Sequence, residues 1–316
     1  MGLKRGEMLH LGKLRSYGDL RGRNATALQM LQVRLHPENT YPMGILEGEV
    51  QQDIKCCTSG WKEKQRKKRI LLRHEGCLNG KWRLIRVLVS VVLPCLNESR
   101  TLAGCIESAQ RAIKRMGVKG EVIVADNGSH DGSPQIASMM GAKVVVQPKR
   151  GYGNACRAGM DAAKGEFILL ADSDGTYDLE EIWKLVEMLR RGYDLVLGSR
   201  LRGQIEKGAM PFLHRYVGTP VLNVLMRLLF GVKVSDSQSG MRGIRREAYC
   251  RLDLKGEGME FASEMLVKAA MMGMRIGEVP ISYRRRKGGE SKLRTFRDGW
   301  RHLKIIASFK LSLNNK

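Results

Sequence analysis

The 316-residue sequence contains no run of about 18 apolar residues, the length that a helix needs to span a bilayer. Its first residues, MGLKRGEMLHLGKLRSYG, lack the apolar core of a secretory signal. We therefore expect no transmembrane helix in this chain and a cytoplasmic location. The seven cysteines include no CxxC pair and no Cys/His cluster with zinc spacing. Four of them are expected to be small buried side chains in a reducing compartment: Cys95, Cys105, Cys156 and Cys250.

Two common nucleotide-binding signatures are also missing. There is no GxxxxGK[ST] motif, which excludes a P-loop nucleotidase, and no GxGxxG follows the first predicted strand. Acidic residues are outnumbered, with 32 Asp and Glu against 55 Lys and Arg, which gives a net charge of +23. This charge favours anionic partners such as phosphorylated substrates, acidic lipid surfaces or nucleic acid. No aromatic-basic RNA motif or zinc finger is present, so we do not expect nucleic acid to be the partner.

The sequence divides into three parts of different character. Residues 1–86 mix Gly, Asn, Gln and charge without a sustained apolar period, and include a basic run at 61–73. We expect them to form a basic N-terminal extension that is disordered or irregular. Residues 87–304 carry the periodic patterns of a folded domain, and residues 305–316 are expected to form a short C-terminal tail.

Within the folded part, apolar runs alternate with amphipathic segments. Strands are predicted at 87–93, 121–125, 143–146, 167–171, 194–200 and 276–283, with helices at 101–116, 178–191 and 260–272. Residues 235–246 are interpreted as a polar loop that leads into a basic turn. This alternation predicts an α/β protein with a doubly wound, mostly parallel sheet flanked by helices.

Two segments have an apolar character that leaves their environment open. Residues 205–230 are strongly apolar with few charges, and they fit either a core helix or a helix that lies on a membrane. From residue 296 onward, apolar side chains recur at helical spacing with basic residues between them. This second pattern is typical of an interfacial helix on an anionic membrane surface.

Two carboxylates close the most apolar strand. Asp172 and Asp174 directly follow the run at 167–171, and residues two apart in an extended segment point to the same side. Ligands of open α/β sheets bind outside the carboxyl ends of the strands. The two side chains are therefore candidate ligands for Mg²⁺ or Mn²⁺, with the remaining positions left to waters and a diphosphate. The alternative is a simple turn with a helix cap.

Further candidates lie at other loops. Asp126 follows the strand at 121–125, where it could bind a nucleoside base or ribose, although Asp-Asn-Gly-Ser is also a common turn. Basic residues gather late in the chain, where they either clamp phosphates or form a solvated basic face. They are Arg242, Arg245, Arg246, residues 284–287 and Lys292.

Several ordered motifs together resemble the family 2 inverting glycosyltransferases with the GT-A fold, and among them the dolichyl- or polyprenyl-phosphate sugar synthases. The motifs cover nearly all of residues 87–304. They are VSVVLPCLNE at 89–98, VADNGSHDGS at 124–133, KRGYGNACRAG at 149–159, LLADSDGTYD at 169–178, LGSR at 197–200, GAMPFLHRYVGTPVLN at 208–223, SDSQSGMRG at 235–243, GMEFASEM at 258–265 and GGESKLRTFRDGWRHL at 288–303.

This resemblance implies a role for particular residues. Asp172 and Asp174 match the metal-binding pair, and Asp126 matches the base-binding aspartate. The implied catalytic residues are Asp174, Arg286 and Lys292, and Ser239 and Arg242 would bind the acceptor phosphate. The implied nucleotide-sugar ligands are Pro94, Asn97, Glu98, Asp126, Arg150, Asp172 and Arg200.

The resemblance also implies a reaction. A UDP- or GDP-linked hexose would be transferred to a dolichyl or polyprenyl phosphate by a protein associated peripherally with the cytoplasmic face of a membrane. A lipid phosphate is already anionic, so it needs no general base and only requires alignment and charge neutralisation.

Three departures from the family pattern keep alternatives open. Asn127 replaces a common second aspartate, the N-terminal extension is long and basic, and no membrane span follows Trp300. One alternative is a family 2 enzyme that acts on a polysaccharide or cell-wall hydroxyl, although the QxxRW motif of processive synthases is absent. A second is an inactive, truncated glycosyltransferase or a basic nucleic-acid-binding protein.

Overall fold

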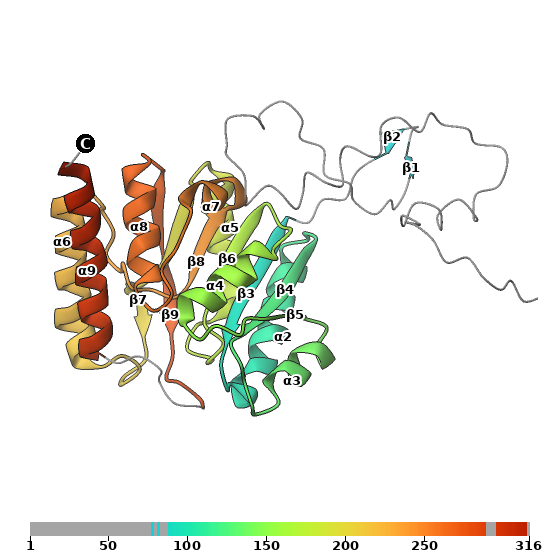
Figure 1. Ribbon diagram of the computed structural model, residues 1–316. Helices are drawn as coiled ribbons and strands as arrows, with labels where there is room; N and C mark the ends of the chain where they lie inside the picture. The colour runs from blue at the N-terminus through green and yellow to red at the C-terminus, as the bar shows by residue number, and fades with distance from the viewer. Residues whose placement is uncertain (1–76, 79–80, 83–87, 289–294, 315–316) are drawn as a thin grey trace, which may run out of the picture. The chain divides into compact units, whose positions relative to one another are not determined.

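The structure is a computed structural model that describes residues 77–78, 81–82, 88–288 and 295–314 (Figure 1). The expectation for residues 1–86 therefore falls almost wholly outside the described residues. From that stretch the structure gives two short antiparallel strands, β1 (Cys77–Leu78) and β2 (Lys81–Trp82). Lys292 and its neighbours at 289–294 also lie outside the described residues.

A seven-stranded sheet with the order β5-β4-β3-β6-β8-β7-β9 forms the centre of the domain. Its strands are β3 (Val89–Cys95), β4 (Gly120–Asp126), β5 (Lys143–Val146), β6 (Phe167–Leu170), β7 (Leu195–Ile205), β8 (Arg242–Arg245) and β9 (Ile276–Tyr283). Among these strands, β8 alone runs antiparallel to its neighbours. The predicted mostly parallel sheet is confirmed.

Helices cover both faces of this sheet, and alternate strand residues point to opposite faces. Val91 belongs to the apolar cluster that includes α2 and α5, whereas Val92 belongs to the cluster that includes α4 and α8. The helices are α2 (Ser99–Arg115), α3 (Ser133–Met139), α4 (Tyr152–Asp161), α5 (Ile182–Arg190) preceded by the 3₁₀ turn η4 (Leu179–Glu181), the π-helical turn η5 (His214–Gly218), α6 (Thr219–Phe230), α7 (Arg246–Leu252), α8 (Phe261–Met271) and α9 (Thr295–Asn314). Because both faces are covered, the strands read as nearly continuous apolar runs.

The structure differs from the sequence expectation at β8. The sequence suggested a polar loop and a basic turn over residues 235–246, but Arg242–Arg245 is a central strand between β6 and β7. Arg242 and Arg245 fit there because their guanidinium groups donate to backbone carbonyls, including those of Ala262 and Tyr193. The strand was missed because these acceptors come from distant parts of the chain.

The C-terminal helix also differs from the expected boundary at residue 304. Helix α9 continues without a break to Asn314, and Ile306 is fully buried. Figure 1 shows α6, α8 and α9 together at one edge of the sheet, and these helices pack against one another. Within the described part of the chain, no helix is long and apolar enough to cross a membrane.

Helix α6 is neither a core helix nor a wholly exposed one. Leu222 and Met226 are buried, whereas Val221, Val224 and Leu228 on the same helix are exposed. Exposed apolar side chains of α9 include Trp300 and Leu311. A helix with this pattern packs one side against the protein and presents apolar surface on the other.

Candidate active site

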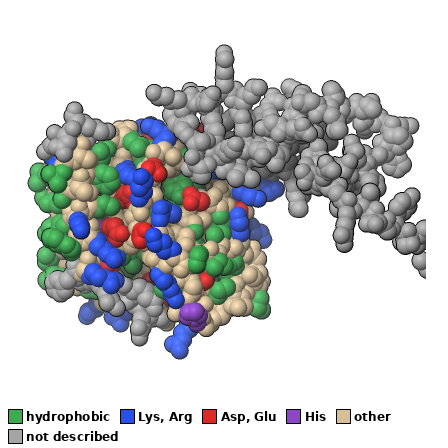
Figure 2. Space-filling view, viewed as in Figure 1, with side chains coloured by type: hydrophobic (Ala, Val, Ile, Leu, Met, Phe, Trp, Pro, Cys, Tyr) green, Lys and Arg blue, Asp and Glu red, His purple; other side chains and the backbone are tan. Residues whose placement is uncertain are grey.

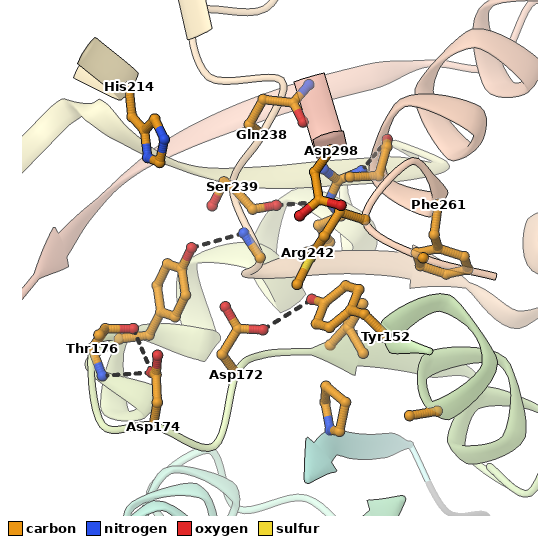
Figure 3. A pocket seen from close by; sticks show the side chains of 18 of the residues that line it. Tyr152, Asp172, Asp174, Thr176, His214, Gln238, Ser239, Arg242, Phe261 and Asp298 are labelled. Atoms are coloured by element: carbon orange, nitrogen blue, oxygen red, sulfur yellow. Dashed lines mark hydrogen bonds between the residues drawn. The ribbon is translucent and has the colours of Figure 1, made fainter. Parts of the chain in front are cut away.

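A cavity of about 710 Å³ opens where β3 and β6 end and β8 begins (Figure 3). The carboxyl ends of the parallel strands meet at this edge, and the antiparallel β8 starts there. Nine residues singled out from the sequence line the cavity: Pro94, Glu98, Arg150, Asp172, Asp174, Arg200, Ser239, Arg242 and Arg286. Asn97 and Asp126 are not among the lining residues. Lys292 is outside the described residues, so its predicted role stays a prediction.

The cavity has two ends of different chemistry. We call one the carboxylate end, formed by Glu98, Asp172, Asp174 and Arg286. We call the other the helical end, to which η5, α6, α8 and α9 contribute the following side chains: His214, Leu222, Phe261, Asp298 and His302. Ser239 and Arg242 lie between them at the start of β8.

Asp172 is held by a tyrosine that sequence reasoning did not single out. The Tyr152 hydroxyl at the start of α4 donates to Asp172 Oδ1 over 2.9 Å, as Figure 3 shows. Burial, together with the charge of Asp174, raises the pKa of Asp172 to about 6. Gly240 lies beside this carboxylate, and a Cβ atom there would collide with Asp172 Oδ2. Only glycine at position 240 leaves this carboxylate oxygen unobstructed.

Asp174 is fixed by its own loop and by a distant arginine. Its Oδ1 atom accepts hydrogen bonds from the backbone N–H and hydroxyl of Thr176, at 3.0 and 2.6 Å. Its Oδ2 atom lies 3.0 Å from Arg286 Nη1, and Arg286 also contacts Glu98. The predicted turn interpretation of Asp-Ser-Asp-Gly is therefore partly correct, because Asp174 both closes a turn and faces the cavity.

The two carboxylates fit a hard divalent cation. Among the described residues, no group of three or more His, Cys, Asp or Glu is arranged to hold a metal. Asp172 and Asp174 would therefore supply two oxygen ligands and leave other positions to the oxygens of a bound molecule. Burial and, after it, the charge of Asp174 raise the pKa of Asp172, and a cation bound between the two carboxylates would oppose both effects.

Asp126 closes its own loop. Its carboxylate accepts hydrogen bonds from the backbone N–H groups of Gly128 and Ser129, at 3.0 to 3.2 Å. Asn97, in a left-handed conformation, bonds the same loop through the backbone N–H of His130. Neither residue lines the cavity, and their predicted direct contact with a nucleotide stays a prediction.

Asn127, which replaces a second aspartate, lines the cavity and ties the end of β4 to the loop at 147–151. Its amide donates to the carbonyl oxygens of Gln147 and Lys149, and its Oδ1 accepts from the N–H of Gly151. These bonds set the position of Arg150 and of the first turn of α4. The amide suits this role because it donates and accepts at once, which an aspartate cannot do.

Arg200 and Arg242 reach the cavity with most of their hydrogen bonds already made. Arg200 forms a bidentate ion pair with the fully buried Asp236, at 2.7 and 2.8 Å. Arg242 donates to the carbonyl oxygens of Ser237, Ser239 and Ala262. These arginines brace the loop that carries Ser239 and Gly240, and their predicted contacts with phosphates stay predictions.

The helical end and the cavity wall at Ser239 contain further buried polar groups. The His302 Nδ1 atom lies 2.7 Å from the hydroxyl of Ser263, and burial lowers the pKa of His302 to about 4. Asp298, one helical turn earlier, is also buried. The hydroxyl of Ser239 is fully buried and has no hydrogen-bond partner among the described residues. Such an orphan hydroxyl at a cavity wall is available to a bound molecule.

Only one of the cavity residues that were not predicted from the sequence had a local sequence signal. Tyr152 lies in the glycine-rich segment at 149–159, where an aromatic residue between two glycines could have been noticed. Asp236, Asp298 and His302 lie within the motifs at 235–243 and 288–303, but nothing in these motifs distinguishes them, because their partners are set by the tertiary fold.

Comparisons with known proteins place this architecture among glycosyltransferases. A model of the family described as glycosyl transferase family 2 matches residues 90–252. The chain is 44% identical over 219 residues to the low-salt glycan biosynthesis hexosyltransferase Agl6 of Haloferax volcanii, covering 69% of this chain and 52% of that protein. It thus spans about half the length of that relative.

Two further matches cover more of the other protein. The dolichyl-phosphate hexose transferase of Haloferax volcanii is 36% identical over 213 residues, which is 67% of this chain and 89% of that protein. Glucosyl-3-phosphoglycerate synthase of Mycobacterium tuberculosis, solved with Mn²⁺, uridine diphosphate and glucosyl-3-phosphoglycerate, superimposes with a TM-score of 0.56 at 25% identity, covering 71% of this chain and 80% of that chain. The domain thus has the GT-A-type fold that the sequence predicted.

Proposed function

This chain belongs to glycosyl transferase family 2, and we propose that it transfers a hexose from a UDP- or GDP-linked sugar to a dolichyl or polyprenyl phosphate at a membrane surface. One observation supports the assignment of a lipid acceptor. The cavity that contains Asp172 and Asp174 extends to η5, α6 and α9, and these same segments carry exposed apolar side chains. A molecule with a phosphate head and an apolar tail would place its head beside Ser239 and Arg242 and its tail along this apolar surface.

The carboxylate end is assigned to the donor. A Mg²⁺ or Mn²⁺ ion held by Asp172 and Asp174 would act as a Lewis acid that stabilises the departing diphosphate. Tyr152 and Thr176 orient the two carboxylates, and Arg286 supplies positive charge beside them. The mycobacterial synthase with a similar fold was solved with Mn²⁺ and uridine diphosphate, which supports this assignment.

The acceptor phosphate is assigned to the region of Ser239 and Arg242. One phosphate oxygen attacks the anomeric carbon, the bond between sugar and diphosphate breaks, and the nucleoside diphosphate leaves. The buried hydroxyl of Ser239 is a free donor for this phosphate. Because the phosphate is already ionised, the role of the chain is to orient it and neutralise charge.

The exposed side of α6 and α9 is assigned to an anionic membrane surface. Figure 2 shows apolar side chains along the edge where these helices lie in Figure 1. Trp300 is 67% exposed and Leu228 is 77% exposed, and the exposed Arg227 and Lys304 lie on the same two helices. Apolar and basic side chains together favour the interface of an anionic bilayer. This supports peripheral association on the cytoplasmic face, where nucleotide sugars would be available.

The test is transfer of radiolabelled hexose by the full chain. The chain is incubated with labelled UDP- or GDP-hexose, Mn²⁺ and vesicles that contain a polyprenyl phosphate, and label in the organic phase is counted. We expect metal-dependent label in that phase, which is abolished by EDTA and by omission of the lipid phosphate. Absence of transfer with every donor, while the protein remains folded, would refute the proposal.

A second candidate acceptor is a phosphorylated small hydroxyl compound. It is favoured by the similar fold of a structure solved with glucosyl-3-phosphoglycerate and by the buried carboxylate of Asp298 in the cavity. A hydroxyl acceptor needs a general base, and the carboxylate of Asp298 at the helical end is a candidate for that base. Water-soluble label formed with 3-phosphoglycerate but not with lipid phosphate would favour this candidate.

A further inference from the structure

Arg286 lies between Glu98 and Asp174, two of the three acidic residues of the carboxylate end. It follows β9 in the chain, whereas Glu98 follows β3 and Asp174 follows β6. Its Nη1 atom lies 3.0 Å from Asp174 Oδ2, its Nη2 atom donates to Glu98 Oε1, and its Nε atom donates to the carbonyl of Gly288 over 2.8 Å. Every nitrogen of the guanidinium thus has an acceptor, and the carboxylates it joins are mostly buried.

This arrangement engages both oxygens of Asp174. The Oδ1 atom bonds Thr176, and the Oδ2 atom is ion-paired with Arg286. A divalent cation that approaches Asp174 in this state meets a positive charge already bound there. Since like charges at such short distance repel strongly in a partly buried site, the guanidinium opposes binding of the metal alone.

A nucleoside diphosphate changes this balance. Its phosphate oxygens are acceptors that match the planar fork of a guanidinium, and bidentate arginine–phosphate pairs are strong. Arg286 can exchange a carboxylate for a phosphate with little loss of hydrogen bonding, and the exchange releases Asp174 for the cation. The two ligands would then help each other to bind.

We propose that Arg286 is an internal counter-ion that holds Asp174 and Glu98 until a nucleoside diphosphate takes over its guanidinium, so that metal and nucleotide bind cooperatively. This inference rests on the proposed donor site. Arg286 then has a role before the nucleotide binds, in addition to any later contact with the leaving group.

Arg284 offers a matched control two residues earlier. It is also a strand-end arginine that pairs with a carboxylate, that of Asp178, but this pair is more exposed and neither residue lines the cavity. Arg284→Ala therefore removes the same side chain from the same segment and leaves the carboxylate end intact.

The experiment measures Mn²⁺ binding by the full chain with electron paramagnetic resonance, first without nucleotide and then with UDP or GDP. Without nucleotide, Arg286→Ala is expected to bind Mn²⁺ at least about tenfold more tightly than the unaltered chain, because the competing charge is gone. Arg284→Ala is expected to change the affinity by less than about twofold. Adding the nucleotide should tighten Mn²⁺ binding strongly in the unaltered chain and much less in Arg286→Ala.

Arg286→Lys is a second variant that keeps the proposal testable if Arg286→Ala does not fold. A lysine keeps the charge but cannot bridge two carboxylates with a planar fork, so Mn²⁺ affinity should lie between the two extremes. Mn²⁺ binding by Arg286→Ala and Arg286→Lys that is no tighter than in the unaltered chain, with unchanged thermal midpoints, would overturn the proposal. Tighter Mn²⁺ binding by Arg286→Ala, combined with no hexose transfer to lipid phosphate by the unaltered chain, would support this proposal and refute the proposed acceptor instead.

Discussion

The two ends of the cavity reach their final geometry in different ways. At the carboxylate end, acidic side chains follow strands of a parallel sheet and are fixed by short loops, as Thr176 fixes Asp174. At the helical end, the lining comes from helices that are far apart in the sequence, as Leu222 and His302 illustrate, and the same helices leave apolar side chains such as Leu228 exposed. The first end is built for charge and the second for an amphipathic molecule, so changes at each should damage different steps.

The largest effect is expected at the carboxylate end. Asp174→Asn keeps the shape of the side chain but removes the charge, so we expect a loss of more than about 100-fold in hexose transfer, because both the metal and Arg286 lose a partner. The rate of transfer at saturating donor is the measurement.

A control for this variant is Asp253→Asn, which alters a carboxylate that is 78% exposed and away from the cavity. Its rate should stay within about twofold of the unaltered chain. Equal losses in the two variants would contradict the assignment of the carboxylate end.

At the helical end, the expected effect is on stability and depends on pH. His302 is buried and its folded-state pKa lies at about 4, below the ordinary value of 6.5, so the folded chain resists protonation that the unfolded chain accepts. This contribution is fully present above pH 6.5 and is lost as the pH falls from 6.5 to 4, by up to about 3 kcal/mol. Urea unfolding at several pH values measures the free energy of unfolding.

His302→Gln sharpens the same prediction. The amide can still hydrogen-bond to Ser263 but does not titrate, so the free energy of unfolding should fall less steeply between pH 6.5 and 4 than in the unaltered chain. An unchanged slope would show that other groups carry the acid sensitivity.

A smaller effect is expected for the tyrosine that positions Asp172. Tyr152→Phe removes the donor to Asp172 Oδ1 without altering the ring, and loss of such a supporting hydrogen bond is expected to weaken metal affinity about 10- to 100-fold. Mn²⁺ titration in the presence of nucleotide measures this. The matched variant is Tyr249→Phe, which removes a hydroxyl bonded to Asp161, outside the cavity, and should leave Mn²⁺ affinity unchanged.

The smallest effect on catalysis is expected on the exposed side of α9. Trp300→Ala removes a 67% exposed aromatic side chain, so binding to anionic vesicles should weaken by roughly 5- to 30-fold while transfer to a short, soluble prenyl phosphate stays within about twofold. Vesicle sedimentation and the soluble assay give the two readouts. Met139→Ala changes an exposed apolar residue on α3 and serves as the control, with no expected effect on either.

Local sequence was sufficient wherever the signal was local. The apolar runs predicted the parallel strands, and the spacing of Asp172 and Asp174 after one such run placed both at a strand end next to the cavity. Asp126 was found by the same reasoning, yet its carboxylate bonds the loop that follows it. A strand-end aspartate therefore has two uses that sequence spacing does not distinguish.

Contacts between segments that are distant in the chain could not be predicted from the sequence. Arg242 was expected to bind phosphate, and its burial in β8 depends on carbonyl groups that include that of Ala262, twenty residues away. Arg286 was expected near the phosphates as well, but its position between Glu98 and Asp174 depends on strands separated by more than 100 residues.

By itself the sequence determined the family, the parallel sheet and the pair of carboxylates, because strand periodicity and strand-end chemistry are properties of a few neighbouring residues. Only the tertiary structure decided which charged groups neutralise one another and which apolar side chains stay exposed. A charge is satisfied by whatever the fold brings within hydrogen-bond distance, and a helix buries only the side that its neighbours cover.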